Sequence, residues 1–212
     1  MLASDCLDAA RLALFDPAPG AGWADAELLT YLNEAIRDSV AAKPDIYPVS
    51  GDIPLAAGVV QTLPAGGVLL IDITHNSDTG RTVSVVDLPL LQEANRFWPA
   101  ATQQAEVENF AVDPRTPRKF LVSPPNNGLG QVYGTYGGTP SALTATSDTF
   151  PLLDLYQPAM TAYVISRAYA KNSKRQDLAK SATYRQQWAQ ALGAKSVATA
   201  TTLPRVSQSP DL

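Results

Sequence analysis

Histidine and cysteine, which often catalyse reactions or bind metals, each occur once in this chain. As a catalytic base, His75 would need a nucleophile such as Ser77 or Ser84 close by. We expect instead a loop histidine that bonds to the backbone or to water. Cys6 lies among alanines on one face of a predicted helix, which is typical of an inert buried thiol. Intrachain disulfides, thiolate metal clusters and histidine-rich metal sites are excluded, because each needs more of these residues.

Two pairs of carboxylates and one glycine-containing segment are the other candidates for chemistry. Asp5 with Asp8, and Glu106 with Glu108, would each lie on one face of an element, as an acid–base pair requires. A helix dipole and a solvated strand face explain the two pairs equally well, and we favour these explanations. Residues 126–130 lack a phosphate-binding lysine and the full glycine spacing of a nucleotide-binding loop, so they predict a turn. We therefore expect no active site and no cofactor.

Basic residues gather in two places. One is a predicted turn with Arg115, Arg118 and Lys119, and the other is a late helix junction with Lys171, Lys174, Arg175 and Lys180. Neither cluster has the interleaved aromatic residues of a nucleic-acid site, and a net charge of −4 argues against binding through phosphates. The turn suits either an acidic partner or plain solvation, whereas the junction partly offsets a helix dipole.

The composition describes a folded chain whose surface is short of charge. Charged residues make up 17% of the 212 residues, against about 25% in an ordinary soluble domain. The hydrophobic fraction of 45% suffices for a packed core. We expect other subunits to cover part of this neutral surface. The first residues do not resemble a signal peptide, and no apolar run is long enough to span a membrane, so we expect a soluble protein that is not secreted.

Helical periodicity appears near both chain ends. The spacing of apolar residues predicts helices over residues 4–15, 25–42, 154–171 and 174–192. Ser4 and Asp154 are the expected caps of the first and third helices, while Pro44 and Gly193 are expected to end the second and fourth. The last three helices have similar lengths, which favours an antiparallel bundle.

The middle of the chain has the short apolar runs of β-strands. Seven strands are predicted, over residues 49–55, 59–63, 68–74, 81–86, 107–112, 119–123 and 129–136. We expect hairpin turns at residues 55–59 and 113–117, and one helix at about residues 88–97 with Asp87 as its cap. The sequence thus predicts an α+β fold in which N- and C-terminal helices form an antiparallel bundle around an inserted β-rich module.

The predicted domains are residues 1–43 with 152–195 as a discontinuous helical bundle, 44–151 as the β-rich module, and 196–212 as a flexible C-terminal arm.

Several segments together resemble one known family. The stretch with Trp23, Asp25, Leu28, Tyr31, Leu32 and Asn33, followed by Lys43-Pro44-Asp45, resembles the opening signature of tailed-phage head-to-tail adaptor (connector, tail tubular protein A-like) proteins. Residues 61–67 and 113–115 are similar to that family's middle region. Arg167, Tyr169 and residues 184–193 are similar to its closing helices. Ala24 stands where a capping Ser or Thr is expected, so we expect Asp25 to cap the helix instead.

The resemblance implies a structural protein of the virion neck that is assembled in the host cytoplasm. Adaptors of this kind form rings, commonly of twelve copies, beneath the portal, and they extend the DNA channel towards the tail. The implied partners are further copies of the chain, the portal protein and a tail nozzle or tail-tube protein. DNA would pass without specific binding, and no membrane is implied. A charge-poor exterior agrees with a subunit that buries two different faces in a ring.

Two surfaces are expected to make the outer contacts of such a ring. Leu203, Pro204, Arg205 and Val206 form the only expected anchor of a portal-binding arm, and Arg115, Arg118 and Lys119 form the tail-facing turn. One alternative is another neck or tail-tube ring protein without direct portal contact. The other is an envelope-degrading hydrolase, for which only His75 and scattered carboxylates offer acid–base groups.

Overall fold

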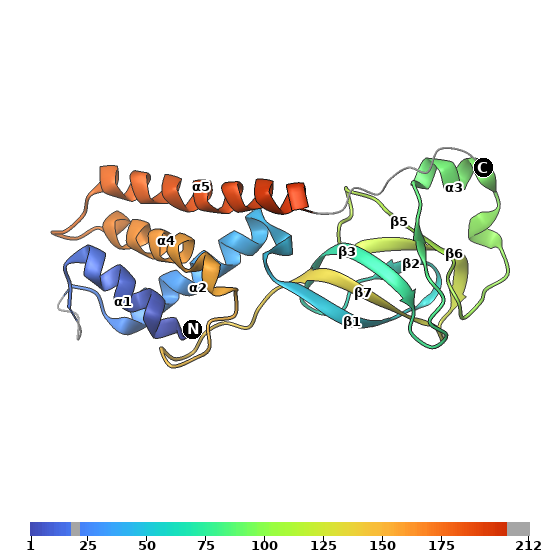
Figure 1. The fold of residues 1–212 in the computed structure, drawn as a ribbon, viewed down its shortest axis with the longest axis horizontal. Helices are drawn as coiled ribbons and strands as arrows, with labels where there is room; N and C mark the ends of the chain where they lie inside the picture. The colour runs from blue at the N-terminus through green and yellow to red at the C-terminus, as the bar shows by residue number, and fades with distance from the viewer. Residues whose placement is uncertain (18–21, 203–212) are drawn as a thin grey trace. The chain divides into compact units, whose positions relative to one another are not determined.

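A computed structural model describes residues 1–17 and 22–202 of the chain, with side chains up to Gly193 (Figure 1). The fold is α+β, with five α-helices and two β-sheets in the described part. The chain divides into two compact units. Met1–Ser39 and the chain from Ser141 onward form a helical unit, and Val40–Pro140 form a β unit.

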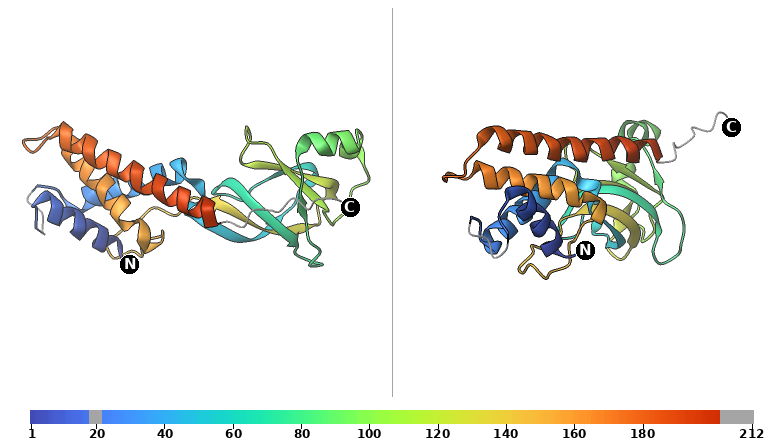
Figure 2. Two further views of the ribbon diagram at one scale, coloured as in Figure 1. Left: turned by 45° about the horizontal axis from the view of Figure 1, so that its top comes forward. Right: turned by 60° about the vertical axis from the view of Figure 1, so that its left-hand side comes forward.

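The helical unit draws its helices from both ends of the chain. They are α1 (Ala3–Leu14), α2 (Asp25–Ala42, whose last residues belong to the β unit), the 3-10 turn η3 (Asp154–Tyr156), α4 (Gln157–Ala170) and α5 (Leu178–Thr202). α4 packs along α5 on one side and against α1 on another (Figures 1 and 2). The core is apolar because Leu28 and Leu32 of α2 and Met160 and Val164 of α4 are fully buried.

Several predicted helix ends are wrong, because hydrogen bonds to the backbone decide them. α1 begins at Ala3, and the Asp5 carboxylate accepts the Leu2 N–H at 2.7 Å, so Ser4 is not its cap. Asp25 is the first residue of α2 and not its cap. Asp154 begins the 3-10 turn ahead of α4. Asp177, which the sequence did not single out, caps α5 by accepting the Lys180 N–H at 3.0 Å.

The last helix is longer than predicted. α5 continues through Gly193 to Thr202, so Gly193 does not end it, and residues 196–202 of the predicted arm are helical. A glycine with no positive φ can sit inside a helix, at a cost of about 0.8–1 kcal/mol relative to alanine. The lengths are also unequal, since α4 has 14 residues and α5 has 25, or about 21 and 37 Å. The argument from matched helix lengths is therefore wrong.

The β unit holds two sheets around one core. Its elements are η1 (Pro44–Ile46), β1 (Pro48–Pro54), β2 (Ala57–Thr62), β3 (Gly67–Asn76), β4 (Ser84–Val85), α3 (Leu88–Ala94), η2 (Trp98–Ala100), β5 (Asn109–Val112), β6 (Lys119–Asn127) and β7 (Gln131–Gly138). The strand orders are β1-β7-β3 and β2-β6-β5-β4, antiparallel except for the pair β4–β5. Ile53 and Val132 of one sheet share a core cluster with Phe120 and Val122 of the other.

One of the two predicted hairpins is wrong. Residues 113–117 do join the antiparallel neighbours β5 and β6. Residues 55–59, however, link β1 to β2, which lie in different sheets. The buried side chain of Gln61 holds this crossing, because its amide accepts the Ala56 N–H at 2.7 Å and donates to the Ala56 carbonyl at 2.9 Å. A side chain thus supplies hydrogen bonds that a hairpin partner would otherwise make.

Candidate functional site

The residues with catalytic potential have ordinary structural partners. His75 is a strand residue of β3, not the expected loop histidine; its Nδ1 lies 2.8 Å from the Thr74 hydroxyl, and its ring stacks on Tyr133. Ser77 donates to Asp52 at 2.7 Å. Cys6 is buried, and burial together with Asp5 raises the pKa of its thiol to about 12, which disfavours the reactive thiolate.

The other candidate groups also serve the backbone or form ion pairs. Glu106 precedes β5 and pairs with Arg81 at 2.7 Å. The predicted turn at residues 126–130 is confirmed, since the buried Asn126 side chain accepts the Gly128 N–H at 2.8 Å and donates to the Ala105 carbonyl at 2.8 Å. Within the described residues, no three His, Cys, Asp or Glu side chains meet in a way that could hold a metal ion.

The family-signature residues, in contrast, come together inside the helical unit. Tyr31 on α2 donates to Glu27 at 2.8 Å, and the Arg167 guanidinium of α4 lies 5.5 Å from the centre of the Tyr31 ring. Arg167 also donates to Glu34 at 2.7 Å. Burial and the hydrogen bond to Glu27 raise the pKa of Tyr31 to about 12, so the phenol stays protonated as a donor. These residues fasten α2 to α4.

Asn33 fastens α2 to the segment that enters the helical unit from the β unit. Its side-chain amide donates to the Leu143 carbonyl at 2.9 Å and accepts the Leu143 N–H at 2.8 Å. Two opposed bonds to one residue fix both the position and the orientation of that backbone. Tyr169 makes the corresponding link between α4 and α5, by stacking on Tyr184 and lying under the Lys180 ammonium.

A charge cluster with Arg11 and Asp16 buried at its centre joins the end of α1, the start of α2 and the loop between α4 and α5. The Asp16 carboxylate accepts Arg11 of α1 at 3.0 Å and the backbone N–H groups of Gly22 and Trp23 at 3.0 and 3.2 Å. Arg175, from the loop between α4 and α5, reaches the same carboxylate at 3.4 Å and covers the Trp23 ring. Burial alone would raise the pKa of Asp16, but the bonds from Gly22, Trp23 and Arg175 lower it.

Asp25 completes this cluster. It forms an ion pair with Arg11, so its carboxylate serves α1 and not the N-terminus of its own helix. The basic junction predicted from the sequence is thereby largely accounted for. Arg175 belongs to the cluster, Lys171 pairs with Glu27 at 2.8 Å, and Lys180 pairs with Asp177 at 3.4 Å.

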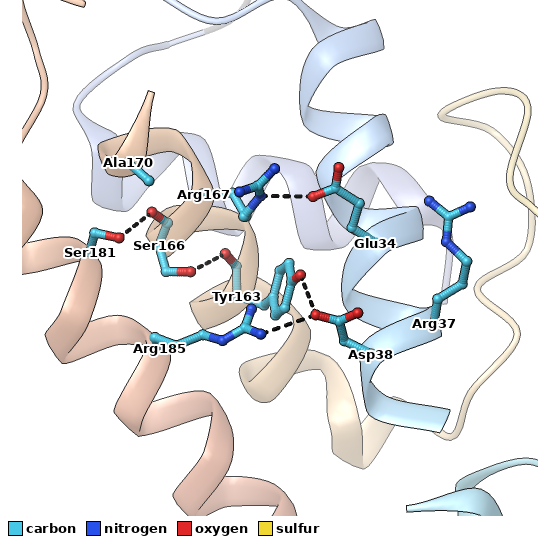
Figure 3. A pocket seen from close by; sticks show the side chains of 9 residues that line it. All are labelled: Glu34, Arg37, Asp38, Tyr163, Ser166, Arg167, Ala170, Ser181 and Arg185. Atoms are coloured by element: carbon cyan, nitrogen blue, oxygen red, sulfur yellow. Dashed lines mark hydrogen bonds and ion pairs between the residues drawn. The ribbon is translucent and has the colours of Figure 1, made fainter. Parts of the chain in front are cut away.

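An open pocket of about 500 Å³ lies between α2, α4 and α5. Figure 3 shows two ion pairs crossing it, Arg167 with Glu34 and Arg185 with Asp38, while Arg37 extends clear of both. Asp38 accepts the Tyr163 hydroxyl at 2.6 Å and Arg185 at 3.0 Å. Partial burial opposes ionisation of Asp38, but these two bonds lower its pKa, so it stays charged.

Sequence reasoning missed Arg185, Asp38, Arg11 and Asp16. The Arg185 guanidinium lies over both Tyr163 and Trp188, at 4.3 and 4.4 Å from the ring centres. The spacing of Arg185 and Trp188 by three positions on one helix was an available signal. No pattern in the sequence indicated that Asp38 of α2 would be the partner of Arg185.

Of the two predicted contact surfaces, the structure describes the tail-facing turn but not the anchor of the portal-binding arm. Arg115 and Asp113 form a pair with two bonds of 3.0 Å on the exposed β5–β6 turn, while Arg118 and Lys119 are exposed beside it. The arm anchor, Leu203 to Val206, lies outside the described residues. Throughout residues 1–17 and 22–202, every helix is too short or too polar to cross a lipid bilayer.

Comparison with protein families matches residues 1–209 to a family described as "SU10 adaptor protein". A comparison with curated proteins found no match. The family match spans both compact units and includes all of the signature residues that hold α2, α4 and α5 together.

Proposed function

Because this chain belongs to the SU10 adaptor family of phage head-to-tail adaptors, we propose that it is a ring-forming subunit that links the portal to the tail and extends the DNA channel. The family match over residues 1–209 carries this proposal. The ring has twelve copies in the neck of the virion, and DNA passes through it without specific binding. The family is structural, so the chain needs no catalytic site.

The arrangement of side chains supports a rigid structural role. Ion pairs link the N-terminal to the C-terminal part of the unit, a ring contact joins α4 to α5, and a reciprocal amide pair joins α2 to Leu143; none of these contacts requires a ligand. A subunit of a closed ring presents two different faces to its neighbours and keeps both in a fixed geometry. The low charged fraction of 17% agrees with a chain that covers much of its surface on assembly.

The outer contacts of the ring belong to two segments. Leu203 to Val206 anchor the arm on the portal, with apolar residues around a single arginine. Arg118 and Lys119 face the tail protein. Because Asp113 neutralises Arg115, these two carry the net positive charge of the turn, which suits an acidic surface on the tail protein.

Electron microscopy of the purified protein mixed with its portal protein tests the central claim. We expect ring density of twelve subunits beneath the portal. If the mixture shows portal particles without added density, the proposed function is wrong.

Deletion of Leu203–Leu212 tests the arm, with deletion of Gln208–Leu212 alone as the matched control. We expect the longer deletion to abolish binding to immobilised portal and the shorter one to preserve it. If both deletion variants bind the portal as well as the full chain does, the arm does not contribute to portal binding. It would favour the alternative of a neck or tail-tube ring protein that does not touch the portal directly.

A further inference from the structure

One edge of α1 carries apolar side chains that nothing in the described helical unit covers. Asp8, Leu12 and Phe15 follow one another at helical spacing, and we call these three residues the α1 ridge. Leu12 is 81% exposed and Phe15 is 89% exposed, more than any other large apolar side chain described in this unit. A hollow of about 410 Å³ borders the ridge. Such side chains mark a contact surface when they lie together.

The backbone of Phe15 supports this reading. Phe15 ends α1 in the left-handed conformation, with φ of 52°. Glycine adopts this conformation freely, whereas a residue with a side chain is strained there by about 1–2 kcal/mol. Since the ring is almost fully exposed, it returns little burial energy within the subunit. A contact with another molecule would bury the phenyl ring of Phe15 and supply this missing burial energy.

The pocket between α2, α4 and α5 offers surfaces on which the apolar side chains of the α1 ridge can pack, and we call this pocket the arginine groove. Ser166, Ala170 and Ser181 are small residues in its lining, which leaves room for incoming side chains. Arg167 and Arg185 cross the groove with their guanidinium planes held by Glu34 and Asp38 (Figure 3). Guanidinium faces and arginine stems are surfaces on which leucine and aromatic side chains pack.

Charge gives the contact its orientation. Three arginines and two carboxylates line the groove, and both carboxylates are engaged, so Arg37 has no hydrogen bond or ion pair among the described residues. The α1 ridge ends in Asp8, whose carboxylate is likewise exposed and unpaired in the part of the chain that the structure describes. An unpaired anion on one surface and an unpaired cation on the other are complementary.

The ridge and the groove are different faces of one unit. The two hollows share no lining residue, and α1 is packed against α4, so a subunit cannot place its own ridge in its own groove. A contact between two different faces repeats from copy to copy and closes into a ring when the rotation allows it. The fitting occupant of the groove is therefore a second copy of this chain.

We propose that the α1 ridge of one copy docks in the arginine groove of the next, with Asp8 facing Arg37 and with Leu12 and Phe15 covering the arginine stems. The inference rests on the ring assembly proposed above and adds the residues of its lateral contact. Each subunit uses the ridge on one side and the groove on the other.

Charge reversal tests the contact. The variants are Asp8→Arg, Arg37→Asp and the double variant with both changes, and each is mixed with portal protein at equal concentration. Native mass spectrometry then measures the ring fraction. We expect each single variant to need at least tenfold more protein for half-assembly, because like charges meet at every contact. The double variant restores an opposite pair at every contact, so we expect it to recover most of the assembly.

A second pair of variants tests the apolar part. Leu12→Glu is compared with Leu129→Glu, because both leucines are 81% exposed and neither supports its own core. We expect Leu12→Glu to abolish rings and Leu129→Glu to leave them intact. Equal behaviour of these two variants would overturn the proposal.

The outcomes separate this contact from the proposed function. If the wild-type chain forms no rings with or without portal, the proposed function fails, and this contact fails with it. If wild-type rings form and the single reversals assemble equally well, only the contact is refuted. A double variant no better than the worse single variant also refutes it. Variants that form rings but lose the portal would assign the ridge to the portal and overturn the proposal.

Discussion

Replacement of Asp16 by asparagine should destabilise the helical unit by about 3 kcal/mol. Asp16 is 2% exposed, and each of its two oxygens accepts two donors. One oxygen takes Arg11 and the Trp23 N–H, and the other takes Gly22 N–H and Arg175. Asparagine has one oxygen and one NH₂ group, so in either orientation a donor group faces two donors. Loss of a charged hydrogen bond contributes about 1.5–3 kcal/mol, and an unsatisfied buried N–H adds about 1–3 kcal/mol.

The lower values of both contributions apply, because Arg11 keeps its second partner, Asp25, when Asp16 is replaced. Urea unfolding followed by circular dichroism, at concentrations where the protein is monomeric, measures the loss. Asp8→Asn is the matched control, since Asp8 is exposed on the same unit. It should change the free energy of unfolding by less than about 0.5 kcal/mol.

The pH dependence gives a second check on Asp16. Its pKa in the folded protein is lowered from the ordinary value of 3.8. The stability that its charge contributes is therefore present above pH 3.8 and is lost as the pH falls through the lower, folded-state pKa. The difference between the wild type and Asp16→Asn should shrink in that acid range, where both side chains become neutral. A loss below about 1 kcal/mol at neutral pH, or an equal loss in acid, would refute the reasoning.

Three further predictions concern single residues. Asn33→Ala removes both bonds to Leu143 and should lower the free energy of unfolding by about 2 kcal/mol, as measured in urea; an unchanged midpoint would contradict the anchoring role. Gly193→Ala should raise stability by about 0.4–1 kcal/mol, because an added Cβ meets nothing within 4 Å, and a lower melting temperature would speak against the continuous α5 helix. Cys6 should resist iodoacetamide in the native protein at neutral pH and react after unfolding in urea, which mass spectrometry would detect; rapid native labelling would contradict its raised pKa of about 12.

The sequence predicted the strands well because their apolar runs fill one shared core. All seven predicted runs overlap strands β1 to β7. The link at residues 55–59 could not be predicted, because turn composition does not tell whether two strands join one sheet or two. That choice depends on β6 and β7, which begin sixty or more residues further along the chain and take β2 and β1 as their partners.

Helix ends were predicted less well, for a physical reason that Gly193 and Asp177 illustrate. Glycine is frequent after helices, yet it ends a helix only where the backbone takes a positive φ, and α5 passes through Gly193. Asp177 caps α5 through an ordinary side-chain bond, but the preceding polar residues offered several equivalent caps. Local propensity therefore leaves these boundaries undecided.

The contacts between helices and the two proposed docking surfaces, the α1 ridge and the arginine groove, depend on residues that are distant in sequence, so the sequence did not predict them. Tyr31 and Arg167 were both singled out, but only the fold brings the two together. The unpaired state of Asp8 and Arg37 could not be predicted at all. It depends on which side chains lie near each of them, and no pattern along the chain encodes that proximity.

The division of the helical unit between the two ends of the chain has a consequence for protein synthesis. Residues 1–39 leave the ribosome first, but α4 and α5, which they pack against, follow the whole β unit of Val40–Pro140. At about 5–20 residues per second, a ribosome needs about 5–20 s to make that insertion. During this interval α1 and α2 lack α4 and α5, against which their apolar faces pack, whereas the β unit has all of its strands as soon as Pro140 has been added. The helical unit is thus the last part of each new chain to fold. The arginine groove, which needs α4 and α5, forms only when synthesis is almost complete.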